Sequence, residues 1–140
     1  MGNHHQQVGL VGKLHNLMGY SEYEDSRRAI GRAFHVIRGM LSKDEALALT
    51  HILPSDLMVI YLSSWKLDAP SLSIKHLDEF IISVKQLDEG RRRSVFHSEI
   101  EALKCSLLVL ELLDKELNIL KLLPDTLYQE VKQALIHPAA

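Results

Sequence analysis

Apolar residues recur along this chain at steps of three and four positions, the spacing that places side chains on one face of an α-helix. The pattern is strongest from Ser94 to Leu113, and from Cys105 onward almost every position of this stretch is apolar. A helix that is apolar nearly all round must be buried, because exposure would leave a large hydrophobic patch in water. We therefore expect this stretch to be the central helix, capped by Ser94 or, one turn later, by Ser98.

Helix start signals divide the rest of the chain into further helices. Ser21 and Ser42 are each followed three residues later by a glutamate, which is the pattern of a capping box. Pro54 and Pro124 each precede polar residues and an apolar helical pattern, and proline suits the first turn of a helix. Asp114 is predicted to cap a short helix after the central one. No strand-like alternation competes, so we expect an all-α fold.

The two halves of the chain repeat one pattern. When the chain is slid by 70 residues without a gap, apolar positions and a Leu-Pro step superpose. The matches include Leu10 with Phe80, Leu14 with Val84, Ile30 with Ile100, Ile37 with Leu107, Leu47 with Leu117 and Pro54 with Pro124. This agreement favours two similar units of about four helices each over a chance coincidence of helical phase. We predict one domain, 1–140, in which repeats 8–65 and 74–136, joined by a linker at 66–73, pack about a pseudo-twofold axis.

Charge and composition indicate where the protein is located and which classes of partner they do not favour. The chain has 16 Lys and Arg against 18 Asp and Glu, so its overall charge does not favour binding to nucleic acid or to an acidic membrane surface. Residues 1–7 lack the basic start and apolar run of a signal peptide, and no apolar run reaches the roughly 18 residues of a membrane span. Cys105 is the only cysteine, which excludes an intramolecular disulfide. We expect a cytoplasmic protein with no membrane partner.

Catalytic and metal-binding patterns are absent from the sequence. The histidines form no His-x-x-x-His or Glu-x-x-His pair, and His97 with Glu101 offers too few ligands for a metal. Cys105 lies among leucines, whereas a reactive thiol needs an exposed, electropositive setting. No phosphate-binding glycine loop, dinucleotide fingerprint or nucleophile elbow occurs. We therefore expect no enzyme, no cofactor and no metal site, and we identify no small-molecule substrate.

Two groups of arginines are candidates for anion binding. They are Arg27, Arg28 and Arg32 on the second predicted helix, and Arg91, Arg92 and Arg93 before the central one. The second group precedes a helix N-terminus, where the helix dipole disfavours cations unless an anion is also bound. If the two groups converge, they form a phosphate or nucleic-acid patch. In the alternative interpretation, Arg91 to Arg93 are solvated and pair with Asp88, Glu89 or Glu99.

A second candidate surface lies on the predicted helix that runs from Pro54 to about Trp65. Met58, Tyr61 and Trp65 would dock a partner helix or a second copy if their ends are exposed, because tyrosine and tryptophan are frequent interface anchors. The alternative for Trp65 is a partly buried residue that closes the core. We favour a non-enzymatic interaction or structural module that binds a protein partner or itself. The alternative function is binding of an anion, phosphate or nucleic acid through the arginines.

Several segments of the chain match the pattern of one family. They are Arg32-Ala33-Phe34-His35-Val36-Ile37, Leu41-Ser42-Lys43-Asp44-Glu45-Ala46, Leu53-Pro54 followed by Leu57, Tyr61 and Trp65, and His76-Leu77-Asp78-Glu79-Phe80. From about residue 21 to residue 131 the chain resembles the bacterial all-helical domain of unknown function 2267. The run Arg91-Arg92-Arg93 departs from that pattern. The resemblance implies an all-helical bacterial protein with no established activity, and it transfers no catalytic residue.

Overall fold

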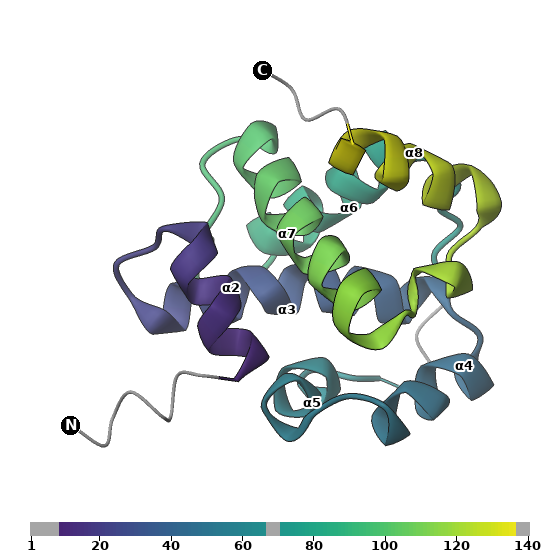
Figure 1. Cartoon of the computed structure of the whole chain (residues 1–140). Coiled ribbons are helices and arrows are strands. Elements are labelled where there is room, and N and C mark those ends of the chain that lie inside the picture. Colours follow the sequence, from purple (N-terminus) through teal and green to yellow (C-terminus); the bar gives the residue numbers. More distant parts are fainter. Residues whose placement is uncertain (1–8, 67–70, 137–140) are drawn as a thin grey trace.

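The computed structural model describes residues 9–66 and 71–136, and over these residues every regular element is helical. Seven α-helices and two short 3₁₀ helices, labelled η, follow one another along the chain (Figure 1). They are α2 (Leu10–Met18), α3 (Tyr23–Met40), α4 (Lys43–Ala48), η1 (Leu49–His51), α5 (Ser55–Leu62), α6 (Leu77–Glu89), α7 (Glu99–Leu117), η2 (Leu120–Leu122) and α8 (Asp125–Ile136). The predicted all-α fold class is confirmed. Residues 67–70 of the predicted linker lie outside the described residues, and no helix within the described ranges is long and apolar enough to cross a membrane.

Helices α3 and α7 cross at the centre, and the other helices pack around them (Figure 1). α3 contacts α2, α5, α6 and α7, whereas α7 contacts α2, α3, α6 and α8. Every residue of α3 from Ala29 to Arg38 is buried, because neighbouring helices cover it on several sides. The apolar pattern predicts 94–113 as the central helix, but α3 is the more deeply buried of the two crossing helices.

Helix α7 begins at the later of the two predicted starts. Its cap is Ser98, whose hydroxyl accepts a hydrogen bond from the backbone N–H of Glu101 at 3.2 Å. Residues before it are not helical, because the backbone N–H groups of Val95 and Phe96 donate to the carboxylate of Asp88 on α6. A contact distant in sequence thus delays the start of this helix.

The buried face of α7 also differs from the predicted one. Ile100 is 65% exposed, although its spacing from Leu103 and Leu107 predicts an inward side chain. The buried positions are Ala102, Cys105, Ser106, Val109, Leu110, Leu112 and Leu113. When apolar residues occur nearly all round a helix, its neighbours decide which side is covered, and here α2, α3, α6 and α8 set that side.

The end of α7 corrects a further prediction. The helix continues through Asp114 to Leu117 and ends at Asn118, whose backbone is left-handed with φ 53°. Asp114 was expected to cap a separate helix, but its carboxylate lies 3.5 Å from the ammonium group of Lys132 on α8. That ion pair links two helices, so Asp114 is an interior position of α7.

The predicted helix starts are confirmed where they depend only on a local capping box or on a proline. Ser42 and Glu45 form both bonds of the capping box that begins α4, at 3.1 Å each. Helices α5 and α8 each begin directly after their predicted proline. The box predicted at Ser21 is absent, because α3 begins at Tyr23 and Glu24 pairs with Arg27.

A buried ion pair joins α3 to α6. Nε of Arg32 donates to Oδ1 of Asp88 at 3.0 Å, and the two side chains are 7% and 0% exposed. The Arg32 guanidinium also donates to the backbone carbonyl of Arg93 at 2.6 Å. The Asp88 carboxylate further accepts the N–H groups of Val95 and Phe96. One pair of charges therefore fixes two helices and the segment that leads into α7.

We predict that Asp88→Asn destabilises the protein by about 3–5 kcal/mol, because it leaves the Arg32 charge buried without a counterion. Urea unfolding measures this loss as a difference in free energy of unfolding. Glu89→Gln is the matched control, since the Glu89 side chain is 61% exposed and pairs only with Lys85 among the described residues. Equal unfolding free energies for the Asp88 variant and the unmodified protein would contradict the structural role of this pair.

Candidate anion-binding site

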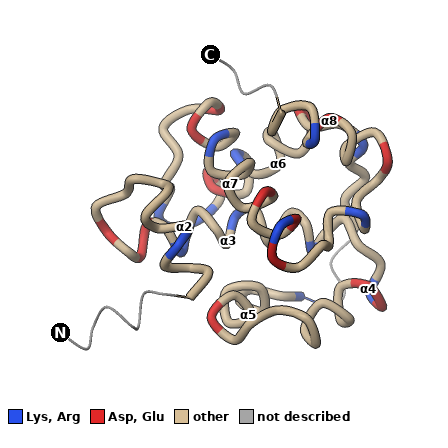
Figure 2. The backbone as a smooth tube through the Cα atoms, viewed as in Figure 1, with Lys and Arg blue, Asp and Glu red and all other residues tan. Residues whose placement is uncertain are grey.

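A pocket of about 460 Å³ lies between α3, the start of α4, the chain that follows α5, and α6. Four basic side chains line it, and no acidic side chain does among the described residues. The basic ones are Arg38, Lys43, Lys66 and Arg91, and further polar lining comes from His35, Ser64, Ser71, Ser83 and Gln86. Along α7, by contrast, Lys follows Asp and Glu closely (Figure 2). The pocket therefore concentrates positive charge in a protein whose formal net charge is −2.

Arg38 is held at the C-terminal end of α5. Its guanidinium donates to the backbone carbonyls of Tyr61, Ser63 and Ser64, the last two at 3.1 and 3.3 Å. Carbonyl groups at a helix C-terminus lack helical partners and carry the negative end of the helix dipole, which favours a cation there. The guanidinium also lies 5.2 Å from the ring centre of Trp65. Neutral acceptors and an aromatic face thus stabilise Arg38, and its positive charge keeps no carboxylate partner among the described residues.

His35 stands one helical turn before Arg38 and is neutral. Its Nδ1 lies 3.1 Å from Nη2 of Arg91, and its Nε2 lies 3.1 Å from the carbonyl of Ile60. A guanidinium only donates hydrogen bonds, so Nδ1 accepts, and the ring proton sits on Nε2 and points to Ile60. Burial, followed by the positive charge of Arg38, lowers the pKa of His35 to about 4.

Arg91 reaches the pocket from the end of α6. Its guanidinium donates to Nδ1 of His35 and, at 3.3 Å, to Oγ of Ser64. Ser64 adopts a left-handed backbone with φ 56°, a conformation that non-glycine residues keep only where their surroundings enforce it. Burial lowers the pKa of Arg91, as does the nearby charge of Arg32. Both partners of Arg91 are uncharged, so its charge is not neutralised by any described residue.

The two candidate arginine groups do not converge on the pocket as groups. Arg27 pairs with Glu24 at 2.9 Å and Arg28 with Asp25 at 2.8 Å, each within α3. Arg32 is sealed against Asp88 in the core and does not line the pocket. Of the six predicted arginines only Arg91 enters the pocket, and the arginine that joins it there is Arg38.

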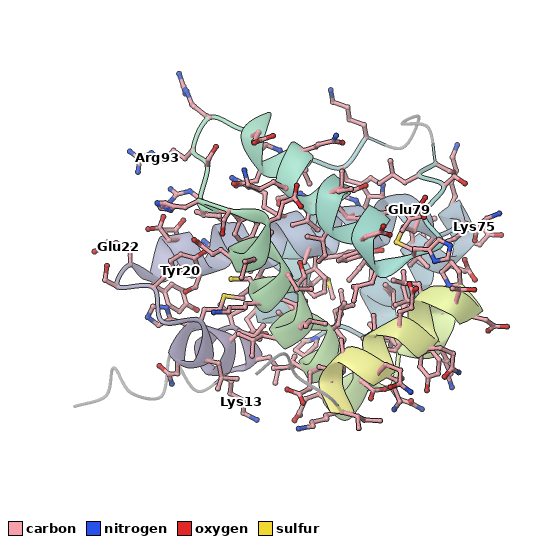
Figure 3. The ribbon with its side chains drawn as sticks, turned by 90° about the horizontal axis from the view of Figure 1, so that it is seen from above. Lys13, Tyr20, Glu22, Lys75, Glu79 and Arg93 are labelled. Carbon is pink, nitrogen blue, oxygen red and sulfur yellow. The ribbon has the colours of Figure 1, made fainter. Side chains whose placement is uncertain are left out.

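Arg92 and Arg93 stay outside the pocket and are exposed. Figure 3 shows Arg93 projecting from the outer edge of the molecule. Arg92 and Arg93 are solvated, as the alternative interpretation expects, but no ion pair of Arg91 to Arg93 with Asp88, Glu89 or Glu99 occurs within the described residues. Asp88 is occupied by Arg32, and Glu89 lies 2.8 Å from Nζ of Lys85. The three consecutive arginines therefore have different surroundings, and only the first is part of the site.

The sequence model of the uncharacterized conserved proteins DUF2267 matches residues 9–129 of this chain. The chain belongs to this family. The resemblance inferred from the sequence segments is thus confirmed. A search of curated proteins finds no match. All lining residues of the pocket fall within the part of the chain that the DUF2267 model covers.

The second predicted surface of this DUF2267 protein is corrected by burial. Tyr61 is fully buried and donates its hydroxyl proton to the carbonyl of Ala46 at 2.7 Å, so it cannot contact a partner. Met58 is half-buried against the core. Trp65 is also half-buried, packs edge to face on Tyr61 and lines the pocket. The structure therefore places Trp65 in the lining of the pocket and Tyr61 in the core, so the two residues do not form the predicted exposed surface.

Other candidate chemistry is not assembled in the described part of this DUF2267 chain. Cys105 is buried, as its leucine neighbours predict, and burial raises the pKa of its thiol. His97, which precedes the cap of α7, lies 3.7 Å from Glu101 on the first turn of that helix. No group of three or more His, Cys, Asp or Glu side chains is placed to hold a metal ion within residues 9–66 and 71–136.

We predict that His35 makes the protein less stable as the pH falls from about 6.5 toward 4. The folded pKa lies below the unfolded value, so the unfolded chain binds the proton more tightly and the stability present above pH 6.5 is lost on acidification. The loss is on the order of 3 kcal/mol. Urea unfolding at about pH 7 and about pH 4.5 measures it.

In His35→Gln this acid-dependent loss should shrink, because an amide donor does not titrate. His97→Gln is the matched control, since the His97 side chain is 82% exposed and does not line the pocket that His35 lines. An identical pH dependence in the His35 variant and the unmodified protein would contradict a neutral, buried His35.

Proposed function

We propose that this protein is a non-enzymatic binding module that holds an anion in the pocket around Arg38 and Arg91. The observation that carries this proposal is a pocket with four basic lining residues and no acidic one among the residues described. The charges of Arg27, Arg28 and Arg32, in contrast, are each balanced by a carboxylate. A concave surface of one charge sign raises the local concentration of ligands of the opposite sign.

The state of Arg91 supports binding of an oxyanion. Its guanidinium is partly withdrawn from water, and its described partners His35 and Ser64 bring no negative charge. A partly desolvated cation gains strongly from a counterion, and guanidinium groups bind phosphate and carboxylate through two parallel hydrogen bonds. Ser64 offers a hydroxyl beside it for a further hydrogen bond to the same ligand.

We also propose that repeats 8–65 and 74–136 are related by a pseudo-twofold axis. The helix contacts support this arrangement because they are reciprocal: α3 packs on α6 as α7 packs on α2, and α3 and α7 pack on each other. The last helix of each repeat also caps the first one. Asp56 of α5 accepts the N–H of Val11, and Glu130 of α8 accepts the N–H of Leu77.

The repeat does not duplicate the anion site. In the register that superposes Pro54 on Pro124, His35 falls on Cys105 and Arg38 on Leu108. The second repeat therefore offers a thiol and an apolar side chain where the first has an imidazole and a guanidinium. This difference supports one anion site per chain.

We predict that Arg91→Gln weakens binding of inorganic phosphate about tenfold or more, because charge-assisted hydrogen bonds contribute about 1.5–3 kcal/mol each. Isothermal titration calorimetry at low salt measures the affinity, and added chloride should reduce it. Arg92→Gln is the matched control, since Arg92 is the next residue, carries the same charge and lies outside the pocket.

Two results would contradict the proposal. Equal losses in the two variants would indicate a diffuse surface effect, and unchanged affinity in Arg91→Gln would place the anion elsewhere. Thermal unfolding of both variants checks that each of them is folded.

A further inference from the structure

We infer that the ligand of this pocket is an organic oxyanion, a phosphate or carboxylate attached to an apolar body, and not a bare inorganic ion. This inference rests on the proposed anion site and specifies the class of its ligand. It follows from how charged and apolar side chains divide the walls of the pocket.

The cationic end of the pocket lies at the C-terminus of α5. Arg38 and Arg91 share a partner there. The carbonyl of Ser64 accepts a hydrogen bond from Arg38, and its hydroxyl accepts one from Arg91. His35 links α5 to the end of α6, because its ring forms hydrogen bonds with the carbonyl of Ile60 and with Arg91. Hydrogen bonds on several sides thus hold both guanidinium groups before any ligand arrives. Such preorganisation suits a compact anionic head group.

Away from this end, apolar side chains line the pocket beside the polar Ser71, Ser83 and Gln86. The apolar ones are Val36, Leu41, Ala46, Trp65, Leu72 and Leu87. Within this set Leu72 is 41% exposed and Leu87 is half-buried, so hydrocarbon faces water inside the pocket. Covering that surface with the apolar part of a ligand is favourable, and a bare phosphate would leave it wet.

Leu72 is fixed in place. Its backbone N–H donates to the carbonyl of Gly39 at 2.8 Å, so this residue is tied to the end of α3. Its side chain covers Gly39 so closely that a Cβ at position 39 would lie 2.9 Å from Cδ1 of Leu72. The absence of a side chain on Gly39 therefore lets Leu72 lie flat against α3 as an apolar wall.

Size and charge distribution favour a small molecule over a polymer. A volume of about 460 Å³ falls within the roughly 300–1,000 Å³ of small-molecule sites. Nucleic-acid surfaces carry basic residues along a stripe, whereas here Arg27 and Arg28 are neutralised by neighbours. Of the arginines without a carboxylate partner among the described residues, Arg38 and Arg91 line the pocket, and Arg92 and Arg93 stay outside it. Lys43 and Lys66 also line the pocket and are exposed, so their charges attract anions toward it.

Trp65, the only tryptophan, lines the pocket and makes a direct test available. The full chain is titrated with hexyl phosphate, inorganic phosphate and 1-hexanol, none of which absorbs where tryptophan is excited. Trp65 fluorescence and calorimetry follow binding. We expect hexyl phosphate to bind at least about tenfold more tightly than inorganic phosphate, since burial of two methylene groups is sufficient for that ratio. Hexanol should bind more weakly than hexyl phosphate.

A pair of variants locates the apolar wall. Leu72→Ser should reduce the ratio of the affinity for hexyl phosphate to the affinity for inorganic phosphate. Leu47→Ser is the matched control, because Leu47 is also a leucine, is 48% exposed and does not line the pocket. Both replaced side chains are exposed, so neither variant should lose the fold.

The outcomes separate this inference from the proposed function. Equal affinities for hexyl phosphate and inorganic phosphate would overturn the inference and leave the anion site standing. Hexanol binding as tightly as hexyl phosphate would overturn both, as would the absence of any binding in calorimetry. A preference for hexyl phosphate that persists in Leu72→Ser would place the apolar part of the ligand elsewhere and overturn the assignment of this wall.

Discussion

The buried ion pair between Arg32 and Asp88 constrains the middle of this structure. Two charges removed from water are stable only when every acceptor and donor around them is used, and the Asp88 carboxylate accepts bonds from Arg32 and from the N–H groups of Val95 and Phe96. These bonds turn residues 91–96 back over the end of α6 and postpone α7 to Glu99. The same turn brings Arg91 to His35, so the proposed anion site depends on the core ion pair.

Within the described residues, the pocket keeps the positive charges of Arg38 and Arg91 because neutral groups bind both guanidinium groups. Arg38 uses the free carbonyls at the end of α5, and Arg91 uses His35 and Ser64. A carboxylate in either place would hold the guanidinium equally well but would remove the attraction for an anion. His35 fits this arrangement because its lowered pKa keeps it an acceptor for Arg91, whereas a protonated ring would repel it.

Local signals explain most of the fold that the sequence predicts. Pro54, Pro124 and the Ser42 capping box mark helix starts because they act on the neighbouring backbone alone. The start of α7 and the choice of its buried face depend on contacts with residues distant in sequence. The periodicity of apolar residues carries no information on such contacts. For the site, the assumption that charged residues face water fails at Arg32 and Arg38. A signal for both exists: Arg32, His35 and Arg38 recur every three residues in the second half of α3, which otherwise holds only apolar residues and glycine. This spacing marks a polar stripe facing the rest of the protein.

The central claim is that Arg32, through its buried ion pair with Asp88, stabilises the fold, whereas Arg38 and Arg91 bind the proposed ligand. NMR observation of the arginine Nε–H signals during a phosphate titration tests it most directly. The account predicts that Arg91 and Arg38 shift and saturate together, while Arg32 does not shift and exchanges its Nε proton slowly because Asp88 accepts it. Equal shifts at Arg92 and Arg93, or a shift at Arg32, would contradict the account.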